Sequence, residues 1–120
     1  MKLLIVDDAE SARETIRSFV GHLADEIHTC ESGYAAAAHC KVYAPDVMTL
    51  DLRMSDNGIL VLEYVRDHCP QIHVLVVTQF VDSAIQKRVM QLGAARCFAK
   101  SEMVELRAYL EQYVAARAVT

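Results

Sequence analysis

Five short runs with strand character, most of them rich in apolar residues, alternate along the chain with stretches of helical periodicity. Apolar runs of this length are typical of strands that are buried on both faces. An alternation of strand and helix with short loops predicts an α/β fold, in which a parallel sheet is covered by helices on both faces. The expected strands cover residues 2–6, 26–30, 46–50, 72–78 and 96–99.

The first two intervening segments carry ordinary helix signals. Apolar residues at i, i+3, i+4 and i+7, starting from Ile16, predict an amphipathic helix over about 9–24. An alanine-rich stretch over 33–43 predicts a second helix, which Pro45 stops because proline disfavours the helical conformation in the residue before it.

The remaining helices are indicated by their expected caps. Asp56 or Asn57 caps a third helix, and Asp82 caps a fourth, for which Gly93 is the C-terminal stop. Ser101 is expected to cap the last helix. The apolar face of that helix consists of Met103, Leu106, Leu110, Tyr113 and Val114.

The composition narrows the class of protein. With 120 residues and 53% hydrophobic content, the chain fits one domain with one substantial core. No window is long and apolar enough to cross a bilayer, and the N-terminus does not resemble a signal peptide, so a cytoplasmic protein is expected. The net charge is −4 and the basic residues are scattered, which argues against binding to nucleic acid or to a membrane.

The cysteines and histidines give no metal-binding pattern. Cys30, Cys40, Cys69 and Cys97 have neither C-x-x-C nor zinc-finger spacing, so they are expected to be reduced thiols packed as small hydrophobic side chains. The five histidines are expected at the surface or at helix ends.

Polar side chains stand at the carboxyl ends of the five expected strands, and those after the second strand, Glu31 and Ser32, are left out of the candidate set because that strand is expected at the sheet edge. Asp7 and Asp8 follow the first strand, Asp51 the third, Thr78 ends the fourth, and Lys100 follows the fifth. In open parallel sheets, ligands bind outside the carboxyl ends of the strands, so these side chains are candidates for one common site. Each residue alone has an ordinary explanation, and Asp8 could simply cap a helix. Such explanations do not account for the whole set.

The chemistry of this set points to a metal ion and an oxyanion. Carboxylates that crowd together repel one another unless a cation lies among them. A hard divalent ion with oxygen ligands, such as Mg²⁺, suits two or three aspartates. Lys100 and Thr78 add a positive charge and a hydroxyl donor, which would neutralise the oxygens of a phosphoryl group, and a carboxylate can attack phosphorus.

The chain resembles the receiver domains of two-component response regulators over essentially all of its 120 residues. The motifs that carry the resemblance are "LIVDD", "LDLRM", "VVT", "QLGA" and "FAK", in this order and at family spacing. The resemblance implies a doubly wound, flavodoxin-like sheet of five strands in the order 2-1-3-4-5. It also implies that residues 1–120 are one receiver domain, with no output domain in this chain.

The resemblance also implies roles for the strand-end residues. Asp51 is the implied phosphoacceptor, and Thr78 and Lys100 are implied to contact the phosphoryl group. Asp8 and Asp51 are implied to bind Mg²⁺ directly and Asp7 largely through water, while the backbone carbonyl of Arg53 completes the protein ligands.

The function implied is that of a phosphoacceptor, not of an enzyme acting on a separate substrate. A histidine kinase or phosphotransfer protein would donate the phosphoryl group, and phosphorylation would switch binding to an effector protein or output domain. A monomer or weak homodimer is expected. The alternative is a pseudo-receiver that binds partners without phosphorylation. A small Mg²⁺-dependent phosphohydrolase with an aspartate nucleophile fits less well, because Arg53 stands where such enzymes have a second aspartate.

The loop after Asp51 departs from the family pattern. Ser55 stands where receivers usually have proline, and Gly58 follows Asp51 by seven positions where eight are usual. The loop is therefore expected to be one residue short, which affects the position of the Arg53 carbonyl and the start of the third helix.

Three further departures surround Lys100 and Thr78. Ser101 replaces the usual proline after the lysine, which disfavours a cis peptide bond there. Cys97 replaces the aromatic residue whose rotation reports phosphorylation, and Phe98 is expected on the opposite face of its strand. Gln79 is bulkier than the usual small residue and is expected to screen the site.

Overall fold

The computed structural model describes residues 1–118, which form one five-stranded sheet. All neighbouring strands are parallel, and their order is β2-β1-β3-β4-β5. The expected fold class and strand order are therefore confirmed. The strands are β1 (Lys2–Val6), β2 (Glu26–Cys30), β3 (Val47–Leu50), β4 (His73–Thr78) and β5 (Arg96–Ala99).

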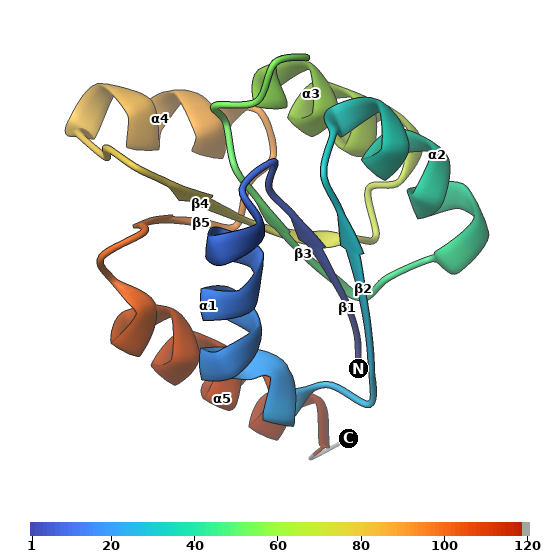
Figure 1. Ribbon diagram of the computed structural model, residues 1–120, viewed down its shortest axis with the longest axis vertical. Coiled ribbons are helices and arrows are strands. Elements are labelled where there is room, and N and C mark those ends of the chain that lie inside the picture. The colour runs from blue at the N-terminus through green and yellow to red at the C-terminus, as the bar shows by residue number, and fades with distance from the viewer. Residues whose placement is uncertain (119–120) are drawn as a thin grey trace.

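Helices cover both faces of this sheet (Figure 1). One layer consists of α2, α3 and α4, and the other of α1 and α5. No helix in the described part of the chain is long and apolar enough to span a lipid bilayer. The helices are α1 (Glu10–Val20), α2 (Gly33–Tyr43), α3 (Gly58–His68), α4 (Ser83–Gln91) and α5 (Met103–Ala118), with a 3-10 turn at Gly21–Leu23.

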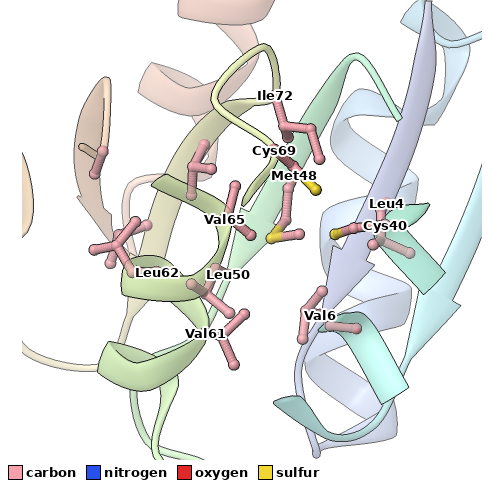
Figure 2. Packing of buried hydrophobic residues seen from close by; sticks show 14 of the residues in the cluster. Leu4, Val6, Cys40, Met48, Leu50, Val61, Leu62, Val65, Cys69 and Ile72 are labelled. Carbon is pink, nitrogen blue, oxygen red and sulfur yellow. The ribbon is translucent and has the colours of Figure 1, made fainter. Parts of the chain in front are cut away.

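Alternate residues of the strands supply two separate cores. Leu4 and Val6 point to the layer of α2, α3 and α4, whereas Leu3 and Ile5 point to the layer of α1 and α5. Figure 2 shows the first core, where strand residues pack against Cys40 of α2 and against apolar residues of α3. A fully buried aliphatic side chain contributes roughly 1.5–3 kcal/mol, so these two cores fix the register of every central strand.

Most helix ends lie where the sequence predicts them. Asn57 caps α3 by accepting a hydrogen bond from the Ile59 amide at 3.0 Å, and Asp82 caps α4 through the Ile85 amide at 2.8 Å. Gly93 has φ +105°, the left-handed conformation expected just past a helix end.

Three expectations about helices were wrong or resolved differently. The first helix does not run to residue 24, because a 3-10 turn replaces its last turn after Val20. The last helix begins at Met103, so Ser101 lies in the preceding turn and does not occupy the capping position. Asp8 is not a helix cap either, since Ala9 holds that position without a side-chain bond.

Candidate functional site

Backbone hydrogen bonds that extend the sheet bring the strand-end residues together. The Asp7 amide donates to the Cys30 carbonyl at 3.1 Å, and the Asp51 amide donates to the Val6 carbonyl at 3.0 Å. The Lys100 amide donates to the carbonyl of Thr78 at 2.9 Å. The sheet ladder thus continues just past the strands, and it fixes the backbone at each of these positions.

The side chains of these residues meet around the Asp51 carboxylate. Thr78 Oγ1 donates a hydrogen bond to Asp51 Oδ1 at 3.1 Å, and the Arg53 amide donates to the same oxygen at 3.2 Å. Lys100 Nζ lies 3.3 Å from Asp51 Oδ2 and 2.9 Å from Asp7 Oδ2. The predicted residues Asp7, Asp51, Thr78 and Lys100 therefore form one contact network.

This network is largely removed from solvent. Asp7 is fully buried, and Asp51 and Thr78 are only 3% and 2% exposed. Burial disfavours the charged form of Lys100, but its ion pairs with Asp7 and Asp51 outweigh burial and raise the pKa of the ammonium above its ordinary value. Lys100 therefore remains a cation at neutral pH and beside the acceptor carboxylate.

The three carboxylates of Asp7, Asp8 and Asp51 converge at one point. Each offers an oxygen within 4.8 Å of the others, and Asp8 is exposed while the other two are buried. Lys100 is the one cation in contact with this trio within residues 1–118, and no donor there is aligned to form a hydrogen bond with Asp7 Oδ2. A buried carboxylate oxygen without an aligned donor, set among two further carboxylates, fits a hard divalent cation such as Mg²⁺.

The loop after Asp51 is compact, and glycine is required at its end. The Gly58 amide donates to the Leu52 carbonyl at 3.1 Å, and the Asn57 amide donates to the Met54 carbonyl at 3.0 Å. A Cβ atom on Gly58 would lie 2.4 Å from the Asp51 carbonyl oxygen. Asn57 adopts φ +58°, a left-handed conformation that asparagine tolerates well. The short loop thus places the start of α3 directly on the backbone of Asp51.

Asp56 ties this loop to a neighbouring helix. Its carboxylate accepts hydrogen bonds from the Gly33 amide at 3.0 Å and from the Tyr34 amide at 2.7 Å, at the first turn of α2. These bonds lower the pKa of Asp56 below its ordinary value. Of the two expected caps for α3, Asn57 therefore fills that role, whereas Asp56 holds the N-terminus of α2.

Phe80, which the sequence did not single out, is exposed and stacks with the side chain of Arg53 beside the site. The guanidinium carbon of Arg53 lies 5.3 Å from the ring centroid of Phe80, so loops after β3 and β4 are joined by a cation–π contact. Gln79 lines a cavity of about 310 Å³ next to Lys100, which is consistent with its expected position near the site. The sequence carried no signal for the Arg53–Phe80 stack, because it depends on how two loops approach each other.

The structure places Cys97 and Phe98 on opposite faces of the sheet, as expected. Cys97 packs in the core under α2, α3 and α4, whereas Phe98 packs in the core under α1 and α5. Burial raises the pKa of the Cys97 thiol, so it stays protonated. The described chain contains no cis peptide bond, in agreement with the expectation for the Lys100–Ser101 bond.

Comparisons with known proteins agree on one family. The sequence pattern of the family described as response regulator receiver domain matches residues 3–111. The chain is 31% identical over 98 residues to the transcriptional regulatory protein LnrK of Bacillus subtilis, a match that covers 79% of this chain and 44% of LnrK. It is also 31% identical over 96 residues to the response regulator protein VraR of Staphylococcus aureus, covering 78% of this chain and 46% of VraR.

The chain thus spans less than half the length of the curated relatives that it matches. Among solved structures, its fold is similar to the signal receiver domain of a DNA-binding response regulator from Colwellia psychrerythraea. That likeness has a TM-score of 0.86 at 23% identity, and it covers 96% of this chain and 98% of the other.

Proposed function

The chain belongs to the family of response regulator receiver domains, and from this premise we propose that Asp51 accepts a phosphoryl group in two-component signal transduction. The observation that carries the proposal is the contact of Asp51 with both Lys100 and Thr78 in a buried acidic site. A cation and a hydroxyl donor at the two oxygens of one carboxylate are suited to a phosphoryl oxygen that arrives there.

In the proposed transfer, Asp51 is the nucleophile, and Lys100 and Thr78 stabilise the phosphoryl oxygens. A carboxylate oxygen of Asp51 forms a bond to phosphorus, and the bond between phosphorus and the donor's imidazole nitrogen breaks, with the electron pair left on that nitrogen. The Lys100 ammonium and the Thr78 hydroxyl then contact phosphoryl oxygens in place of the Asp51 carboxylate. The phosphoryl group stays on the chain, so the domain acts on its own Asp51 and on no separate substrate.

Mg²⁺ is the proposed cofactor of this reaction. Its ligands would be the carboxylates of Asp8 and Asp51, Asp7 largely through water, and the backbone carbonyl of Arg53. When bound, the ion neutralises charge on the transferring phosphoryl oxygens. The close approach of the three carboxylates and the Asp7 oxygen without an aligned donor support this assignment.

The proposed partners follow from the family. A sensor histidine kinase or phosphotransfer protein donates the phosphoryl group to this chain, for which we propose a cytoplasmic location, and an effector protein or output domain responds to it. The relatives LnrK and VraR are named as regulatory proteins, and we extend only the receiver function to this chain. Neither nucleic acid nor membrane is a proposed partner of residues 1–120, which carry a net charge of −4.

A pseudo-receiver is the second candidate, and a specific observation favours it. Buried Cys97 occupies the place of the usual switching aromatic residue, so partner binding that does not depend on phosphorylation is consistent with this core. The two candidates differ in whether Asp51 reacts.

The test is covalent modification by acetyl phosphate in the presence of Mg²⁺. The intact mass should rise by one phosphoryl group, and the adduct should be labile to hydroxylamine, as an acyl phosphate is. Asp51→Asn should give no adduct, whereas Asp56→Asn, which removes a carboxylate outside the trio, should react like the wild type. If no donor gives an adduct with the wild-type protein, the pseudo-receiver is the better interpretation.

A further inference from the structure

Two histidines outside the phosphoacceptor site approach each other on the edge of the sheet. His28 lies in the edge strand β2 and His39 lies in α2, which covers that strand. Nδ1 of His28 is 2.6 Å from Nε2 of His39, and both residues are partly exposed to solvent. The two rings are tilted by 59° with their centroids 4.9 Å apart, so the contact joins the nitrogen atoms and is not a ring stack.

Neighbouring side chains hold the His28 ring in this orientation. The ring of Tyr43 stacks on it at a centroid distance of 3.7 Å and an interplanar angle of 11°. On the other side of the ring, Nε2 of His28 lies 3.2 Å from a carboxylate oxygen of Glu26. A carboxylate at Nε2 favours the tautomer with the proton on that nitrogen, which leaves the lone pair of Nδ1 directed at His39.

We propose that His28 Nδ1 and His39 Nε2 together bind a divalent transition-metal ion such as Cu²⁺, Ni²⁺ or Zn²⁺. Metal–imidazole bonds are about 2.0–2.1 Å long, so two ligands at right angles around an ion have nitrogens about 2.9 Å apart. The observed separation of 2.6 Å is within a few tenths of an ångström of this value, and binding also requires the His39 ring to shift sideways so that both lone pairs point at the ion. With this tautomer of His28, the Nε2–H group of His39 donates a hydrogen bond to His28 Nδ1 in the resting protein, and metal binding requires the proton of His39 to move to its own Nδ1.

The histidine pair is open to solvent, and the Glu26 carboxylate orients the His28 ring as a ligand. The side chain of His28 is 38% exposed and that of Glu26 is 50% exposed, so water or a group from another molecule can fill the remaining coordination positions. The arrangement of a carboxylate behind a ligating histidine is the one that increases ligand basicity in known metal sites. Lys2 lies over the Tyr43 ring, and its charge is opposite to that of Glu26, so no excess of positive charge surrounds the pair.

The chemistry of the pair separates it from the aspartate site. Imidazole nitrogens suit Zn²⁺, Ni²⁺ and above all Cu²⁺, whereas Mg²⁺ takes oxygen ligands. Cys40 follows His39 in the sequence but is buried, and burial together with the Cys69 and Cys30 thiols raises its pKa to about 12. Cys40 therefore stays a protonated thiol, and the two imidazoles are the proposed protein ligands.

The experiment is a Cu²⁺ titration of the full chain in excess Mg²⁺, which occupies the carboxylate site. The wild-type protein should bind one Cu²⁺, and its electron paramagnetic resonance spectrum should show hyperfine coupling to two imidazole nitrogens. His28→Gln and His39→Gln should each bind at least tenfold more weakly, and Glu26→Gln should lose roughly tenfold while keeping the two-nitrogen spectrum. His22→Gln, which removes an exposed histidine elsewhere, should bind like the wild type.

Two results would overturn the proposal. Equal affinity in the wild type and in His39→Gln would mean that the metal binds elsewhere. A wild-type spectrum with fewer than two imidazole nitrogens would do the same without any variant, so the test holds even where a substitution unfolds the protein. Phosphorylation of Asp51 is measured separately with acetyl phosphate, and its failure would not affect this result.

Discussion

At the scale of single residues, the candidate site carries more negative than positive charge. Three carboxylates converge within 4.8 Å, while Lys100 is the one cation that contacts them in the described chain. Like charges at such distances raise the free energy of the folded state, because unfolding separates them. Under the proposed function, this repulsion is the cost in stability of a site that binds a cation and a phosphoryl group.

Asp8→Asn tests this imbalance. Asp8 is the exposed member of the trio, so its loss removes repulsion without leaving a buried group unpaired. We expect the metal-free variant to gain stability on the order of 1 kcal/mol, since solvent screens part of the repulsion. Mg²⁺ at about ten times its dissociation constant should stabilise the wild type by roughly 1.4 kcal/mol and the variant much less. Urea unfolding with and without Mg²⁺ measures both effects.

A loss of stability in Asp8→Asn, with an unchanged response to Mg²⁺, would contradict this account. Asp25→Asn is a suitable control, because it removes an exposed carboxylate that pairs with the N-terminal amine and lies outside the trio. That variant should not gain stability, and its response to Mg²⁺ should be that of the wild type.

The sequence predicts the aspartate site residue by residue, but not the contacts around it. Asp7, Asp51 and Lys100 each directly follow a strand, and in a parallel sheet all such positions lie at one edge. The contact between His28 and His39 has no comparable signal. It depends on how α2 packs across the edge strand, and no helical or strand period relates the two residues because they lie in different elements.

At the scale of elements, the short loop between β3 and α3 determines how the site is supported. Gly58 begins α3 against the backbone of Asp51, while Asp56 holds the first turn of α2. Asp51, the proposed phosphoacceptor, and the N-termini of two helices are therefore connected through the seven residues 52–58. The spacing of seven positions from Asp51 to Gly58 can be taken from the sequence, whereas the bond from Asp56 to α2 could not be predicted, because it joins segments more than twenty residues apart.

Gly58→Ala should disrupt this connection. The added Cβ would lie 2.4 Å from the Asp51 carbonyl oxygen and 2.6 Å from the Leu52 Cα, and backbone atoms cannot rotate away. Alanine is the better helix former, but the steric conflict outweighs that gain, and we expect a loss of about 1–3 kcal/mol. Gly21→Ala is the matched control, since its Cβ would meet only side-chain atoms at 3.2 Å or more. Comparable unfolding free energies for the two variants would refute the argument.

The contact between β4 and α5 should make stability depend on pH. His73 Nε2 lies 2.7 Å from the Tyr109 hydroxyl, and the ring stacks against Tyr113 at 4.5 Å. Burial, and secondarily the charge of Arg117, lower the pKa of His73 below its ordinary value of 6.5. The folded protein thus favours the neutral ring, and the unfolded chain binds the proton first as pH falls.

The contribution of His73 is therefore fully present above about pH 6.5 and is lost as pH falls through the lowered folded-state pKa. The slope for one proton is at most about 1.4 kcal/mol per pH unit. Urea unfolding of the wild type and of His73→Gln at pH 7.5 and 5.5 isolates this term, because other titrating groups cancel. The advantage of the wild type should shrink at pH 5.5. An advantage that grows there would mean that the charged ring is favoured.

At the scale of the whole molecule, the fold was predictable because its determinants are local. Apolar strands, short loops and parallel pairing follow from patterns within a few residues, and together they leave few alternatives to a doubly wound sheet. The two cores divide the molecule into a layer of α2, α3 and α4 and a layer of α1 and α5. Under the proposed function, a conformational change that starts at Asp51 has to pass through one of these cores to reach a distant surface.

The small side chain of Cys97, in the core under α2, α3 and α4, predicts a limited response to phosphorylation. Cys97 is buried there beside Val89 and Ala94, and its small side chain cannot fill and vacate a pocket as an aromatic ring does. A ligand shifts a conformational equilibrium only by its differential affinity for the two states. With beryllofluoride as the phosphoryl analogue, we expect amide chemical-shift changes concentrated at residues 78–82 and smaller ones in β5. Cys97→Tyr should enlarge the response of β5, whereas Cys97→Ser should not, since serine adds no ring. Concerted changes across α4 and α5 in the wild type would show that coupling through this core needs no aromatic residue.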